Sequence, residues 1–162
     1  MTITNNVTRF LDSRKIPYTA RELPAEKLGA RETAQLLHVS PAQVFKTIVV
    51  LREKKKPILA VVPGGRVVDL KLLAALLGEK KVSLAAEREA EALTGLQAGG
   101  ISPLALLNKG FQVVLDSSAQ TYERIFISGG QRGLNIELSP ADLTALVRAR
   151  AGNVSRLEEA AG

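Results

Sequence analysis

Two short apolar runs, separated by a charged segment, constrain the fold of this chain more than any other feature. Residues 44–51 read VFKTIVVL and residues 58–62 read ILAVV, with REKKK at positions 52–56 between them. Runs of β-branched and aliphatic residues on either side of a polar turn are typical of paired strands. We therefore predict an antiparallel hairpin whose tip is the charged segment.

Helical and extended patterns alternate along the rest of the chain. Further strands are expected at residues 18–23, 81–84, 111–115, 124–127 and 134–138. Helices are expected between Asn5 or Asn6 and Pro17, and at residues 32–37, 70–77, 86–93 and 141–150. The alternation predicts an α/β (α+β) fold, in which helices surround a mixed, largely antiparallel sheet. We expect one compact domain over residues 1–162, with a short flexible tail from about residue 152.

The amino-acid composition limits the kinds of molecule that the protein is expected to bind. The net charge of +6 favours an anionic partner such as nucleic acid, or a soluble surface. Aromatic residues make up only 4% of the chain, so a platform that stacks several bases is not expected. The absence of cysteine excludes disulfides, thiolate metal sites and a cysteine nucleophile. No apolar run could span a membrane and the N-terminus has no secretory signal, so we expect a cytoplasmic protein without membrane contact.

The residues of familiar hydrolytic sites are scarce. His38 is the only histidine, and its place at the end of an expected helix indicates a C-terminal residue that interacts with free carbonyls. A single histidine lacks the partners that a catalytic triad or a zinc site requires. We therefore expect no metal and no cofactor.

Lys46, in the middle of the first apolar run, has two interpretations. Along a strand it shares a face with Val44, Ile48 and Val50, where an ammonium group is costly unless it reaches water or an anion. Its stem could lie inside while the head reaches water, or the charge could meet a ligand. Three glycine pairs could present backbone amides to a ligand, but their spacing alone indicates turns, most clearly at Gly64-Gly65. The pairs are Gly64-Gly65, Gly99-Gly100 and Gly129-Gly130.

Three motifs together resemble a known family. VFKTIVV, AGGISPL and ISGGQRGLNIEL, the last followed by a proline and Asp142-Leu143, occur in this order along the chain. This combination resembles the bacterial Cys-tRNA(Pro) deacylase family, YbaK/EbsC, which is related to the editing domain inserted in bacterial prolyl-tRNA synthetases. The resemblance covers about residues 5–150. It implies a partly barrel-like editing-domain fold with a pocket for the 3′ acceptor end of an aminoacyl-tRNA.

The activity implied by the resemblance is removal of cysteine from mischarged Cys-tRNA(Pro), and also from Cys-tRNA(Cys). Apolar pockets discriminate poorly between amino acids of similar size, so a synthetase that mischarges needs a second site. In the mechanism proposed for the family, the sulfur of the substrate cysteine attacks its own ester carbonyl and releases a thiolactone. Prolyl-tRNA synthetase is the further partner that the resemblance suggests.

The resemblance assigns site residues to three segments. Lys46 falls on the lysine that is thought to engage the terminal adenosine or its ester. The substrate-binding positions fall on Gly99, Gly100, Ile101, Ser102, Ser128, Gly129, Gly130 and Asn135. Relatives often carry aspartate where this chain has Asn135, which keeps the hydrogen-bonding reach but loses the negative charge. Many also carry a tyrosine near the position of Leu23. These two departures leave the choice of amino acid open.

Two other functions therefore stay compatible with the sequence. The chain could deacylate another mischarged tRNA, such as Ala-tRNA(Pro). It could also be a non-catalytic module that binds tRNA or a synthetase, since the basic charge and the lack of a nucleophile permit this. Deacylation assays with several charged tRNAs separate the three functions.

Overall fold

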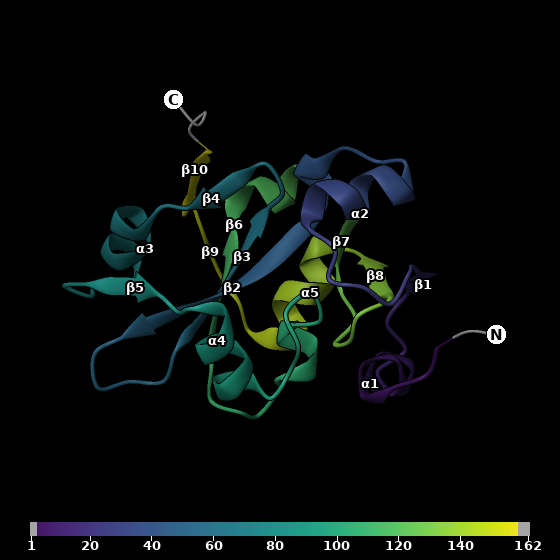
Figure 1. Cartoon of the computed structure of the whole chain (residues 1–162), viewed down its shortest axis with the longest axis horizontal. Coiled ribbons are helices and arrows are strands. Elements are labelled where there is room, and N and C mark those ends of the chain that lie inside the picture. Colours follow the sequence, from purple (N-terminus) through teal and green to yellow (C-terminus); the bar gives the residue numbers. More distant parts are fainter. Residues whose placement is uncertain (1–2, 159–162) are drawn as a thin grey trace.

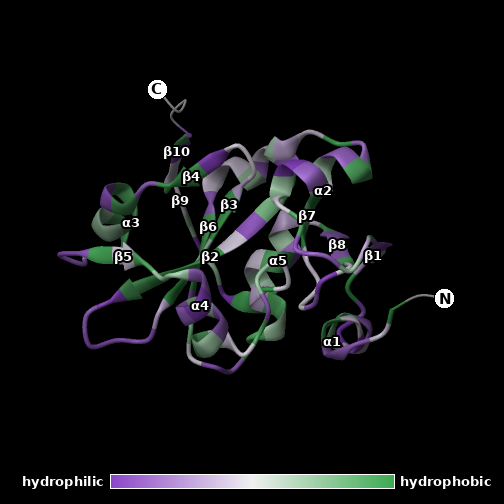
Figure 2. Ribbon diagram, in the orientation of Figure 1, coloured by the Kyte–Doolittle hydropathy of each residue, from purple (hydrophilic) through white to green (hydrophobic). Residues whose placement is uncertain are grey.

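The computed structural model describes residues 3–158. In it, the two apolar runs pair as the predicted antiparallel hairpin, and the other elements are arranged around this hairpin (Figure 1). Strand β2 (Phe45–Arg52) pairs with β3 (Ile58–Pro63), and Lys46 lies opposite Val62. Every residue of β3 is buried, whereas the loop at the hairpin tip is hydrophilic (Figure 2). Burial on both faces explains why the sequence of β3 is apolar throughout.

The strands of the described residues divide among three sheets, so the expected mixed arrangement is confirmed but not as one sheet. The largest has the order β5-β2-β3-β6-β9, and adds β5 (Val82–Leu84), β6 (Gln112–Asp116) and β9 (Arg150–Gly152) to the hairpin. A three-stranded sheet contains β1 (Tyr18–Glu22), β8 (Leu134–Leu138) and β7 (Ile125–Ser128). The third pairs β10 (Ser155–Leu157) with β4 (Arg66–Val68). Among the strand pairs of residues 3–158, β3–β6 and β6–β9 are parallel and the other five are antiparallel, which confirms the largely antiparallel character.

The described residues form five short α-helices, and side-chain caps at Asn5, Asp69 and Ser139 mark the starts of three of them. The five helices are α1 (Asn6–Ser13), α2 (Ala30–Leu37), α3 (Leu70–Leu77), α4 (Glu87–Thr94) and α5 (Pro140–Val147). At α3, the carboxylate of Asp69 accepts the N–H of Leu72 at 3.0 Å, and Gly78 ends the helix at φ +68°. Glycine adopts this left-handed conformation without steric cost, so the sequence signal is strong. None of the helices in residues 3–158 has the length and apolar character needed to cross a membrane.

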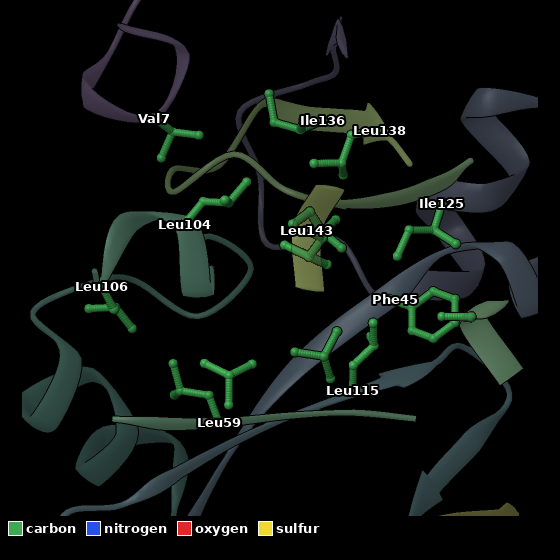
Figure 3. Close-up of a cluster of buried hydrophobic side chains, with 14 of the residues drawn as sticks. Val7, Phe45, Leu59, Leu104, Leu106, Leu115, Ile125, Ile136, Leu138 and Leu143 are labelled. Atoms are coloured by element: carbon green, nitrogen blue, oxygen red, sulfur yellow. The ribbon is translucent and has the colours of Figure 1, made fainter. Parts of the chain in front are cut away.

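The main core lies between the five-stranded sheet and the three-stranded sheet (Figure 3). Phe45 and Val49 of β2 point into it, where Leu143 of α5 fills the space between the sheets. On the other face of β2, Ile48 and Val50 pack toward α3. Strand β2 thus separates two cores and carries side chains into both, as its alternating pattern requires.

The C-terminal region differs from the sequence-based prediction. Helix α5 ends at Val147 rather than Arg150, because residues 150–152 pair as β9 with β6. The predicted flexible tail from about residue 152 is wrong as far as Leu157, because β10 pairs with β4. Between these strands, the buried N–H of Val154 donates to Asp116 Oδ1 at 3.0 Å. Partners distant in the sequence therefore order a segment that is locally polar.

Candidate functional site

A cavity of about 410 Å³ lies beside the first half of β2, and we call it the Lys46 cavity. Its walls come from β2, the start of α2, the β5–α4 connection, the loop at residues 98–101, and strands β7 and β8. Five of the residues expected at the site from the sequence line it, namely Lys46, Gly99, Ile101, Ser128 and Asn135. Three segments far apart in the sequence therefore meet at one hollow.

Lys46 is half-buried in the wall of this cavity. Burial lowers the pKa of its ammonium group from the ordinary value of 10.5, while nearby Glu158 raises it and Arg31 lowers it. Within the part of the chain that the structure describes, Lys46 forms no salt bridge; Arg31 and Glu158 pair with each other at 3.7 Å. A partly dehydrated charge of this kind interacts strongly with an anion or a polarised carbonyl.

The two glycine loops pack directly against each other. Gly99 has φ +88°, and a Cβ on Gly100 would lie 2.9 Å from Gln131 Cα and 3.1 Å from the backbone nitrogen of Arg132. The side chain of Arg132 crosses back and donates to the carbonyl of Ala98 at 2.7 Å. Glycine is needed at the first position for conformation and at the second for close approach. The first loop is thus held against the second.

The remaining predicted positions build these loops without lining the Lys46 cavity. Gly130 has φ +94°, and its N–H donates to Ser128 Oγ at 3.3 Å. A Cβ on Gly129 would lie 2.6 Å from Leu134 Cγ. Ser102 is fully buried, and its hydroxyl accepts the N–H of Leu104 at 3.2 Å.

Thr47 lines the cavity although it was not predicted from the sequence to be a site residue. Its Oγ1 and Asn135 Oδ1 are buried and have no hydrogen-bond partner within the described protein, and both residues line the Lys46 cavity. Buried acceptors without a partner are rare, because desolvation of a polar atom is costly. Threonine is common in strands, where it usually packs against its neighbours, so nothing in the sequence marks Thr47 as a residue of the cavity.

The other candidate residues lie elsewhere. His38 is the C-cap of α2, as predicted, and its backbone N–H donates to the carbonyls of Ala34 and Gln35. Leu23 packs against a separate cluster around Phe126, and Tyr18 donates to Asp12 Oδ1 at 2.8 Å; neither lines the Lys46 cavity. Residues 3–158 contain no group of three or more histidine, aspartate or glutamate side chains placed to hold a metal ion.

Alanine at position 100 is expected to separate the two loops. The added methyl group would press on backbone atoms, which cannot yield as a flexible side chain does. We expect the activity of the site to fall about 10-fold and the free energy of unfolding to fall by about 1–3 kcal/mol. Chemical denaturation and an activity assay measure the two effects.

Gly78→Ala is the control for a glycine substitution away from the site, because Gly78 has a positive φ and no atom within 4 Å of the added Cβ, whereas Gly100 is constrained by close contacts. It should cost about 1 kcal/mol of stability through backbone strain and leave activity unchanged. Equal activity losses in the two variants would contradict a specific role for the contact between the loops.

The chain is similar to a family model, to individual proteins and to solved structures. The family model described as "Aminoacyl-tRNA editing domain" matches residues 25–146. A relative from Enterococcus faecalis, provisionally named as the Cys-tRNA(Pro)/Cys-tRNA(Cys) deacylase EbsC, is 35% identical over 94% of each chain. A proline–tRNA ligase from Aquifex aeolicus is 26% identical over 66% of this chain, which corresponds to 20% of the ligase. A solved structure, provisionally described as a trans-editing enzyme for prolyl tRNA synthetase, has a TM-score of 0.79 and 26% identity, covering 96% of this chain and 99% of its own.

Proposed function

The chain belongs to the aminoacyl-tRNA editing domain family, and from that premise we propose that it is a trans-editing deacylase that removes cysteine from mischarged Cys-tRNA(Pro). The proposal includes Cys-tRNA(Cys), which the name of the Enterococcus faecalis relative also contains. One observation carries it: Lys46 meets the loop at 99–101 and two buried acceptor atoms in one cavity. The cavity volume of about 410 Å³ is in the range of small-molecule sites.

The residues that line the Lys46 cavity favour a nucleophile supplied by the substrate. The titratable groups among them are Lys46 and Glu87, and Glu87 forms a salt bridge with Lys27. Hydroxyl groups are present at Thr33, Thr47 and Ser128, but no histidine and no unpaired carboxylate lies among the lining residues to activate them. A thiol carried by the aminoacyl group would supply the nucleophile.

The proposed reaction does not need a water molecule as a reactant. The thiol of the bound cysteine gives up its proton, and its sulfur attacks the carbonyl carbon of the ester. The bond between that carbon and the ribose oxygen breaks, and the oxygen takes up a proton. The products are a cyclic cysteine thiolactone and a tRNA with a free terminal ribose.

Lys46 and the first loop would stabilise the charge that develops in this step. Lys46 acts as a fixed positive charge that holds the ester end of the substrate, not as a proton shuttle. The N–H groups of Gly99 and Ile101 make no hydrogen bond within residues 3–158, whereas the N–H of Gly100 donates to Gln97. The amides of residues 99 and 101 are therefore the available donors for the carbonyl oxygen, where preorganised donors have their largest effect.

Thr47 and Asn135 complete the proposed site as acceptors. An aminoacyl ester brings an α-ammonium group, whose hydrogens could be accepted by Thr47 Oγ1 and Asn135 Oδ1. Asparagine accepts a hydrogen bond without adding a charge, so the aminoacyl group would be recognised here by hydrogen bonding more than by ion pairing.

The test is a panel of charged tRNAs. Purified protein is incubated with Cys-tRNA(Pro), Ala-tRNA(Pro) and Pro-tRNA(Pro), and loss of each ester is followed. We expect the cysteine ester to be cleaved far faster than the other two. Preferred cleavage of the alanine ester would make the chain a deacylase of another kind. Binding of charged tRNA without cleavage of any ester would make it a non-catalytic module.

A further inference from the structure

A second hollow of about 670 Å³ adjoins the Lys46 cavity, and we call it the basic groove. Three residues, Lys46, Ile48 and Leu84, line both hollows. The groove extends from them along β4, the start of α3 and β10, elements that lie on the α3 side of β2 in Figure 1. Lys46 therefore lies where the two hollows adjoin.

The charges of the basic groove suit a phosphate chain. Lys46, Lys71 and Arg156 line it, and neither Lys71 nor Arg156 forms an ion pair within residues 3–158. The one acidic lining residue, Asp69, already accepts the N–H of Leu72 as the cap of α3. The other lining residues are apolar, which provides a surface for sugars and bases; they are Ile48, Val67, Val68, Leu70 and Leu84.

Arg156 reaches the groove because β10 pairs with β4. In this pair Arg156 lies directly opposite Val67, so the two side chains share a face, and both line the groove. Strand β10 lies beyond residues 25–146, which the family model matches. The C-terminal segment thus adds a positive charge that the matched region does not contain.

Other basic or open borders of the site are less suited to a polyanion. At the α4 side of the Lys46 cavity, Glu87 is paired with Lys27, so that border carries no excess positive charge. In the charged hairpin tip, Lys55 donates to Glu79 at 2.8 Å, and Lys56 lies over the ring of Phe111. The groove therefore combines unpaired positive charge with a position directly beside the cavity.

We propose that the basic groove binds the single-stranded 3′ end of tRNA immediately before the terminal adenosine, with Lys71 and Arg156 contacting its phosphates. This inference rests on the proposed function, because the aminoacylated adenosine is taken to occupy the Lys46 cavity. Phosphate contacts position the strand without reading its sequence. The groove then contributes affinity for RNA and leaves the choice of amino acid to the cavity.

The test compares two substrates in the double variant Lys71→Ala/Arg156→Ala. With Cys-tRNA(Pro), we expect KM to rise about 10-fold, kcat to stay nearly constant, and the slope of log KM against log salt to fall by about 1.4 for two lost phosphate contacts. With 3′-O-cysteinyladenosine, which lacks the preceding phosphates, kcat/KM should match that of the wild type. Thermal unfolding checks that both proteins are folded.

The control is Lys80→Ala/Lys109→Ala, which removes the same charge from two exposed lysines outside both hollows. It should leave KM and the salt slope within about twofold of the wild type. Equal losses on both substrates, or a groove variant that behaves like the control, would overturn the groove while leaving the deacylase intact. A wild-type protein inactive on both substrates would instead overturn the proposed function, and the groove proposal with it.

Discussion

Lys46→Met is expected to reduce kcat/KM for Cys-tRNA(Pro) by roughly 100-fold or more, because preorganised charge is among the largest contributions to catalysis. Methionine keeps most of the apolar stem of the lysine and removes the ammonium group. Single-turnover deacylation measures the effect. Lys80→Met, at an exposed site outside the Lys46 cavity, should keep the wild-type rate. A Lys46→Met protein with wild-type activity would refute the role of the charge.

The same substitution should not destabilise the fold. Burial lowers the pKa of Lys46 in the folded state, so the folded protein disfavours the charged form. The stability linked to this shift is fully present above the unfolded value of 10.5 and is lost as pH falls through the lowered folded value. At neutral pH the ammonium therefore costs stability. Lys46→Met should unfold at the same denaturant concentration as the wild type or a higher one, with a difference that shrinks toward pH 10.5.

The second large effect concerns the thiol of the substrate. Cys-tRNA(Pro) should lose its ester roughly 100-fold faster than Ala-tRNA(Pro), because an intramolecular nucleophile has a high effective concentration and alanine offers none. The enzymatic rate on the cysteine ester should also rise with pH toward the pKa of a thiol, about 8.5, since the thiolate is the nucleophile.

The product distinguishes this mechanism from attack by water. Mass spectrometry of a rapidly quenched reaction should detect cysteine thiolactone before it hydrolyses. Ser-tRNA(Pro), whose hydroxyl is a poorer nucleophile at neutral pH, is the matched control and should react slowly. Equal rates on the cysteine and alanine esters, or incorporation of solvent oxygen into the first product, would exclude thiol attack.

Much of the fold follows from short-range patterns. The central hairpin, helix α3 between Asp69 and Gly78, and the N-cap at Ser139 all lie where the sequence predicts them. Each depends on contacts between residues a few positions apart, or on one residue with a special backbone conformation. The C-terminal strands could not be predicted in this way, because β9 and β10 are ordered by β6, β4 and the carboxylate of Asp116.

The candidate site, like the fold, could be predicted only in part from the sequence. Sequence motifs pointed to Lys46, both glycine loops and Asn135 as candidates, and the absence of cysteine ruled out a cysteine nucleophile. Packing was needed to join Gly100 to the backbone of residues 131–132, to turn Thr47 into the cavity, and to bring Arg156 to the groove that begins at Lys46. The reason is physical: local propensity acts over a few residues, whereas cavities form between segments that only the folded core holds together.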